Sequence, residues 1–130
     1  MSIVAKLLDD RRTSLRMKLY HPAPEEIDLA TVLHALSDPQ RLRIVRLLAE
    51  RHAPVPCGSL GLGVTKSTAT HHFRVLREAG VINQVLIGTS KMTSLRREDL
   101  DQRLPGLLNA VLAAPAGEPA NERTPVVAAP

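Results

Sequence analysis

The segment 66–79 carries two sets of side chains that repeat at helical spacing. One set is mostly apolar and consists of Ala69, His72, Phe73 and Leu76. The other set begins two residues earlier, is polar, and consists of Ser67, Thr70, His71 and Arg74. Because two residues turn an α-helix by roughly 200°, the two sets lie on different sides of the helix. The segment is therefore predicted to be a helix that buries one face and presents hydroxyls, an imidazole and a guanidinium on the other.

The polar face has the chemistry of a helix that reads the major groove of DNA. Small side chains let the backbone approach the duplex, hydroxyls bond to phosphates or base edges, and arginine pairs with guanine. Lys66 adds a phosphate contact, and free N–H groups near the cap at Thr65 or Lys66 face an anion. The predicted DNA contacts on this helix are Lys66, Ser67, Thr68, Thr70, His71 and Arg74.

The adjacent histidines His71 and His72 have different predicted roles. Neighbours on a helix point about 100° apart, so the pair is poorly placed to chelate one metal ion. We assign His71 to the DNA face, with plain solvation as the alternative. His72 is assigned to a buried, hydrogen-bonded packing role, because buried polar groups need partners.

Two helices are predicted ahead of this segment. The first starts at Glu25, with Glu25 and Glu26 at its positive end, and carries the apolar stripe Leu29, Val32, Leu33 and Leu36. The second starts at Pro39, which fits the first helical position, with Ser37 or Asp38 as its cap. The glycine-rich stretch 57–64 can then hold one helical turn.

A hairpin and further helical turns are predicted after the segment. Gly80 is expected in a left-handed conformation that ends the helix. The runs VINQVLI and KMTSLR read as strands joined by a turn at 88–90. Residues 96–103 form a helical turn or two, and a last helix starts at Pro105. Its apolar face consists of Leu104, Leu107, Leu108, Val111 and Leu112. This order predicts a mainly α fold with a small β-hairpin, the winged helix-turn-helix.

The two ends of the chain differ from the domain predicted at 25–113. Residues 1–24 read as a basic, partly ordered arm, and a floppy terminus is the alternative. Residues 114–130 are rich in alanine and proline without periodicity, which predicts a disordered tail.

The composition narrows the class of protein. With one Phe, one Tyr and no Trp, the core must be aliphatic, which suits packed helices better than a β-sandwich. A formal net charge of +4 is consistent with a polyanionic partner. Since no signal peptide or long apolar run is present and there is a single cysteine, we expect a cytoplasmic protein without a membrane partner. No nucleophile–base–acid set or phosphate loop appears, so an enzyme is not expected.

Two motifs taken together resemble the ArsR/SmtB family of bacterial repressors. They are LHALSDPQRLRIVRLL at 33–48 and STATHHFRVLREAGVI at 67–82, and the resemblance covers 25–113. It implies a homodimer on a pseudo-palindromic operator, with a recognition helix, a wing and dimer-forming terminal helices. On the wing, Lys91 would reach the adjacent backbone or minor groove. The residues implied for the dimer interface are Leu29, Leu33, Leu107, Leu108, Val111 and Leu112.

Many members of that family sense metals, and the sequence departs from both of their usual sites. One needs Cys-x-Cys, whereas only Cys57 is present, and the other needs Asp and His on the last helix, which 105–113 lacks. Cys57 with His52, His21 or an arm carboxylate could still form an unorthodox nickel or zinc site, with packing as the alternative role of the thiol. His34 could serve a dimer-interface site or be solvated.

The effector is therefore unknown, and no cofactor is required by the sequence. A metal-responsive regulator, or one whose sensing is supplied by a partner protein, is the alternative to a plain DNA-binding regulator. A protein-interaction module that kept the fold and lost DNA binding is a further alternative.

Overall fold

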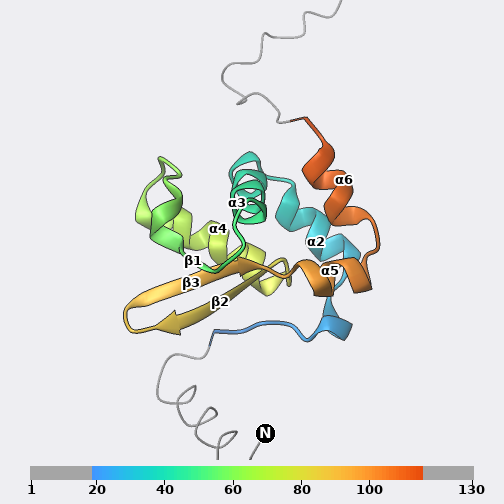
Figure 1. The fold of residues 1–130 in the computed structure, drawn as a ribbon, viewed down its shortest axis with the longest axis horizontal. Helices are drawn as coiled ribbons and strands as arrows, with labels where there is room; N and C mark the ends of the chain where they lie inside the picture. The colour runs from blue at the N-terminus through green and yellow to red at the C-terminus, as the bar shows by residue number, and fades with distance from the viewer. Residues whose placement is uncertain (1–18, 116–130) are drawn as a thin grey trace, which may run out of the picture.

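The computed structural model describes residues 19–115, so most of the predicted arm and tail lies outside the described residues (Figure 1). The elements along the chain are η1 (Pro24–Glu26), α2 (Leu29–Leu36), α3 (Pro39–Ala49), β1 (Val55–Pro56), η2 (Cys57–Leu60), α4 (Lys66–Glu78), β2 (Ile82–Ile87), β3 (Ser90–Leu95), α5 (Arg97–Arg103) and α6 (Leu107–Ala113). This order confirms the predicted winged helix-turn-helix, with β2 and β3 as the wing.

Aspartate side chains set the starts of α2 and α3. Asp28 Oδ2 accepts a hydrogen bond from the backbone N of Thr31 at 3.0 Å, and Asp38 Oδ2 accepts from the backbone N of Gln40 at 2.9 Å. The cap at Asp38 confirms the sequence prediction. The predicted start of the first helix at Glu25 is wrong: Glu25 belongs to the separate turn η1, and Asp28 provides the cap from which α2 begins.

The helix α4 has the predicted cap and the predicted end. Thr65 Oγ1 accepts from the backbone N of Thr68 at 3.3 Å. At the other end, Gly80 has φ +86°, and the N–H of Val81 donates to the carbonyl of Leu76 at 3.0 Å. A left-handed glycine of this kind lets the chain reverse sharply and enter β2.

The wing is part of a three-stranded antiparallel sheet in the order β1-β3-β2. Ile82 pairs with Leu95 and Ile87 pairs with Ser90, so the hairpin prediction is confirmed. Strand β1 was not predicted. It has only two residues, one of them a proline, and it is defined by the pairing of Val55 with Thr93, which no local pattern reveals.

The last helix begins later than predicted. α6 starts at Leu107, whereas Pro105 lies in a turn that is followed by Gly106 at φ +84°. Because a residue at positive φ interrupts a right-handed helix, Pro105 cannot be the first residue of α6. Leu108 is 2% exposed.

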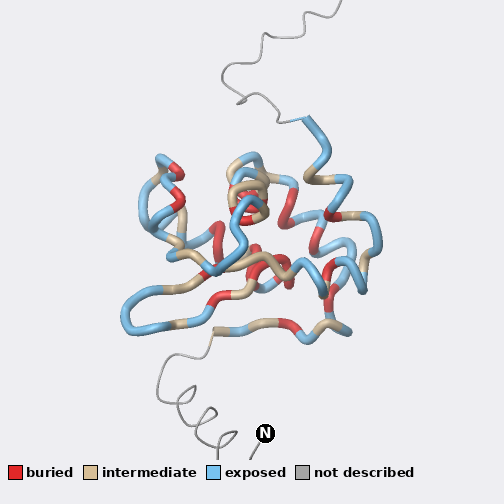
Figure 2. The backbone as a smooth tube through the Cα atoms, in the orientation of Figure 1, coloured by how far each residue is buried: buried red, intermediate tan, exposed pale blue. Residues whose placement is uncertain are grey.

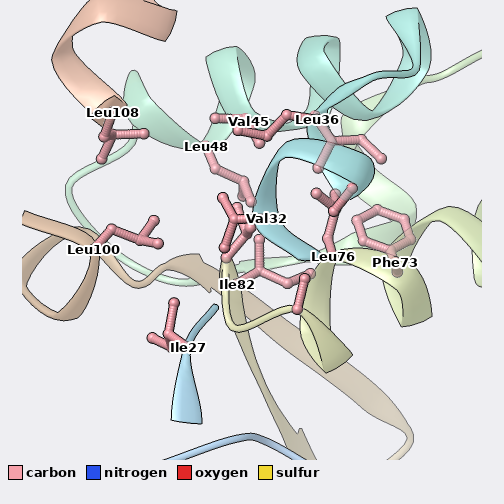
Figure 3. Close-up of a cluster of buried hydrophobic side chains, with 14 of the residues drawn as sticks. Ile27, Val32, Leu36, Val45, Leu48, Phe73, Leu76, Ile82, Leu100 and Leu108 are labelled. Carbon is pink, nitrogen blue, oxygen red and sulfur yellow. The ribbon is translucent and has the colours of Figure 1, made fainter. Parts of the chain in front are cut away.

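The core is aliphatic and lies between the helices and the sheet (Figure 2). Ile44, Val45, Leu76 and Ile82 are fully buried. Phe73 is the one aromatic residue among the buried hydrophobic residues of the described chain. Figure 3 shows that α5 and α6 also contribute, through Leu100 and Leu108. The composition argument for a core made of aliphatic side chains is thus confirmed.

Candidate nucleic-acid interface

The structure separates the two faces of α4 as predicted from the spacing. His72, Phe73 and Leu76 are buried, and Ala69 is half-buried. The six side chains predicted to contact DNA from this helix are all exposed: Lys66, Ser67, Thr68, Thr70, His71 and Arg74. They form one continuous polar surface, which we call the α4 face.

Hydrogen bonds within the α4 face order its hydroxyls and its arginine. The hydroxyl of Thr65 lies 2.8 Å from that of Thr68 and 3.3 Å from that of Ser67. The guanidinium of Arg74 approaches Nδ1 of His71 at 3.5 Å. Neither a hydroxyl nor an imidazole carries negative charge, so these contacts leave the positive charge of Arg74 uncompensated.

Lys66, Arg74 and Lys91 have no carboxylate partner among residues 19–115. Within those residues Arg96 pairs with Asp99, and the carboxylate of Asp38 lies 3.9 Å from Nδ1 of His72. Lys91 is half-buried on β3, close to the exposed wing tip at 88–89. Positive side chains without acidic partners give a surface potential that attracts a polyanion.

A buried polar cluster holds α4 against α3. Arg41 and His72 are each 8% exposed, and Arg41 Nη1 lies 3.2 Å from His72 Nδ1. Arg41 Nε also donates to the carbonyl of Ala35 at 2.6 Å. Because arginine can only donate, His72 Nδ1 accepts and the imidazole is neutral. The predicted packing role of His72 is confirmed, whereas the buried role of Arg41 was missed.

Burial is the main reason that the pKa of His72 lies below its usual value. The nearby carboxylate of Asp38 acts in the opposite direction, and the charge of Arg41 lowers the pKa further. A neutral imidazole is the acceptor that Arg41 needs, so the lowered pKa and the hydrogen bond both indicate a neutral His72.

The three weak metal-site candidates are placed differently by the fold. His21 Nδ1 donates to the carbonyl of Leu19 at 3.0 Å, and its Nε2 accepts from the backbone N of Gln84 at 2.9 Å. His52 is exposed, and Cys57 is half-buried. In the part of the chain that the structure describes, no three His, Cys, Asp or Glu side chains gather in a way that could hold a metal ion. His21 is thus engaged in hydrogen bonds at both ring nitrogens.

The residues implied for a dimer interface fall into two groups. Leu29 and Leu33 on α2 are each 48% exposed, and Leu107, Val111 and Leu112 on α6 are half-buried. Leu108, by contrast, lies in the core of its own chain, because the residues of α6 that face inward are covered by the domain itself. This position corrects the assignment of Leu108 to a surface between chains. His34 is exposed on α2.

The exposed apolar residues of α2 and α6 lie away from the wing. In Figure 1 the wing tip and α6 occupy opposite ends of the horizontal axis. Among residues 19–115, no helix has the length and apolar character required to cross a bilayer.

Comparisons with known proteins agree with this geometry. A family model described as "Helix-turn-helix domain" matches residues 36–85, a span that runs from the last residue of α2 into β2. The chain is also 37% identical over 84 residues to a Bacillus subtilis (strain 168) protein named "Uncharacterized HTH-type transcriptional regulator YceK". That alignment covers 63% of this chain and 84% of the relative. The chain therefore belongs to the family of helix-turn-helix transcriptional regulators.

Proposed function

We propose that this chain is a sequence-specific DNA-binding regulator of the ArsR type, which binds a pseudo-palindromic operator as a homodimer. The observation that carries the proposal is the α4 face: exposed hydroxyls, an imidazole and a guanidinium that has no ion pair among residues 19–115, on a helix whose other side is anchored in the core. The two sequence motifs at 33–48 and 67–82 support the ArsR type.

In this proposal α4 enters the major groove. Lys66 contacts a phosphate from the start of the helix, and Ser67 and Thr70 are short enough to let the helix backbone come close to the bases. Arg74, two turns from the start, pairs with a guanine. Lys91 on the wing binds the neighbouring backbone, so α4 and β3 contact the duplex at two separate places.

The test is selection of bound sequences from a random pool of duplex DNA by the full chain. The expected result is enrichment of one inverted repeat, because a symmetric dimer presents two copies of α4 to two half-sites. Recovery of the pool without any enriched sequence would contradict the proposal, and it is the result expected of an interaction module that had lost DNA binding.

Arg74→Ala is expected to weaken binding to the selected sequence by about 1–3 kcal/mol per half-site, with relaxed preference at one base pair. The measurement is a titration of operator and single-base variants by fluorescence anisotropy. Arg51→Ala is the matched control, because Arg51 is an exposed arginine beyond the end of α3 and outside the α4 face. Equal losses in the two variants would remove the base-reading role of Arg74.

We further propose that the exposed leucines of α2 and the half-buried face of α6 form the dimer interface. The support is that Leu29 and Leu33 remain half exposed in a domain whose other leucines are largely covered. Two such side chains next to each other on a helix are favourable to bury against a second copy.

Leu33→Glu is expected to convert the dimer to a monomer, since a carboxylate would be buried without a partner. Sedimentation equilibrium measures the mass. Val85→Glu is the control, because Val85 is also 48% exposed but lies on the wing. If Leu33→Glu sediments as a dimer, the interface lies elsewhere on the molecule.

A further inference from the structure

A short N-terminal segment crosses the turn that joins α4 to the wing. We call residues 20–27 the strap; in Figure 1 it includes the blue chain that runs beneath the sheet. A Cβ on Gly80 would lie 2.7 Å from Cγ1 of Ile27 and 3.1 Å from Cγ of Pro22. The strap therefore packs directly against the turn at Gly80, where the turn has no side chain.

Three arginines from other parts of the chain donate to main-chain carbonyls of the strap. Arg77 Nε donates to Tyr20 at 3.2 Å, Arg96 Nη1 donates to Pro22 at 2.8 Å, and Arg103 Nε donates to Ile27 at 3.0 Å. Hydrogen bonds from charged donors are stronger than neutral ones. The strap is thus fixed to α4, to the end of β3 and to α5.

The strap also bonds to the wing side of the turn. The backbone N of Gln84 on β2 donates to Nε2 of His21 at 2.9 Å. Arg77 Nη1 donates to Oε1 of Gln84 at 2.7 Å, and Gln84 Nε2 donates to Oγ1 of Thr93 at 3.1 Å. A single chain of hydrogen bonds therefore connects α4, the strap, β2 and β3.

The part of this chain that joins Arg77, Gln84 and Thr93 is buried, whereas the bonds to Tyr20 and His21 are partly buried, so the geometry of the buried part is strongly constrained. Arg77 is 8% exposed, Gln84 is 2% exposed and Thr93 is fully buried. A buried donor or acceptor that loses its partner is left without water to replace it. Movement of the wing relative to α4 would break several of these bonds at once.

We propose that Arg77 and His21 are positioning residues for DNA binding, which fix the angle between α4 and the wing. The proposal rests on the function proposed above. Only residues 79–81 link α4 to β2, and a turn containing a left-handed glycine is not by itself a rigid joint. A duplex that contacts both α4 and Lys91 fits one angle between the helix and the wing. When that angle is already fixed in the free protein, binding avoids the entropic cost of ordering the wing.

The first measurement needs no DNA. Spin labels at Thr68→Cys on α4 and Thr89→Cys at the wing tip, in a Cys57→Ser background, report the helix–wing distance by pulsed electron resonance. Both labelled positions are exposed. Arg77→Gln is expected to broaden the distance distribution. Arg103→Gln removes the same charge and a carbonyl contact at the far end of the strap, at Ile27, but none of the bonds that join α4 to β2, so it is expected to leave the distribution unchanged.

The second measurement is the operator affinity of the Arg77 and Arg103 variants without cysteine substitutions or spin labels. It is interpreted together with footprinting that reports protection of each phosphate. Arg77→Gln is expected to bind on the order of 10-fold more weakly than Arg103→Gln, with protection lost at the phosphates that the wing covers. His21→Leu is expected to behave like Arg77→Gln, whereas His21→Gln, which keeps an acceptor for the backbone N of Gln84, restores wild-type binding.

The outcomes separate this inference from the proposed function. Equal distance distributions for Arg77→Gln and Arg103→Gln would overturn the positioning role. So would a footprint in which protection falls equally at every phosphate, in proportion to the loss of folding stability. Wild-type protein that binds no DNA sequence, with a distance distribution that still broadens in Arg77→Gln, would overturn the function and leave the mechanical link intact. If Arg77→Gln does not fold, the two His21 variants decide the question.

Discussion

Operator binding is expected to weaken on the order of a hundredfold when salt is raised from about 50 to about 200 mM. Lys66 and Lys91, the proposed phosphate contacts, have no ion pair in residues 19–115. If each contacts a phosphate in both copies of a dimer, binding releases counterions at every contact, and the log–log slope is roughly −3.6. Anisotropy titrations at four or five salt concentrations give the slope directly.

Lys66→Gln should make that slope shallower by about 2, one unit for each copy in the dimer, and weaken all sequences to a similar degree. Arg51→Gln loses the same charge outside the α4 face and should keep the wild-type slope. A slope near zero for the unmodified protein, or the same change in both variants, would mean that these cations do not meet phosphates.

Gly80→Ala is expected to lower the free energy of unfolding by about 2–5 kcal/mol. A left-handed conformation costs an L-residue about 1–2 kcal/mol, and Gly80 has φ +86°. The added Cβ would also press against Ile27 at 2.7 Å, and overpacking of that kind costs about 1–3 kcal/mol more. Urea unfolding followed by circular dichroism measures the change.

Gly63→Ala separates the two contributions. Gly63 also has positive φ, +71°, but no atom lies within 4 Å of the position of its Cβ. It should therefore lose only the conformational part, about 1–2 kcal/mol. Equal losses at the two glycines would show that the strap yields to the new methyl group and is not firmly seated over the turn.

Much of α4 could be predicted because its signals are local. The spacing of Phe73 and Leu76, the cap at Thr65 and the glycine at position 80 all lie within one stretch of chain, and the structure confirms each of them. The predicted start of the first helix at Glu25 is wrong for an equally local reason. The acidic pair 25–26 favours a helix start only through its charge, whereas Asp28 accepts a hydrogen bond from a helix N–H group, which is the stronger signal.

The buried arginines could not be predicted from spacing. Arg41 and Arg77 interrupt otherwise apolar helix faces, and a charged side chain is rarely buried unless it has partners. Their partners include the carbonyls of Ala35 and Tyr20 and the side chain of Gln84. Tyr20 lies 57 positions from Arg77 in the sequence, so nothing near Arg77 reveals that its guanidinium is satisfied.

The order of elements, the two faces of α4 and the left-handed end of that helix were determined by the sequence alone, because helical periodicity, capping and glycine geometry act over a few neighbouring residues. Tertiary structure alone decided that Leu108 belongs to the core, that two residues at 55–56 form a strand, and that the strap joins α4 to the wing. Each of these depends on a contact between distant segments, and burial and hydrogen bonding across such contacts are properties of the packed chain.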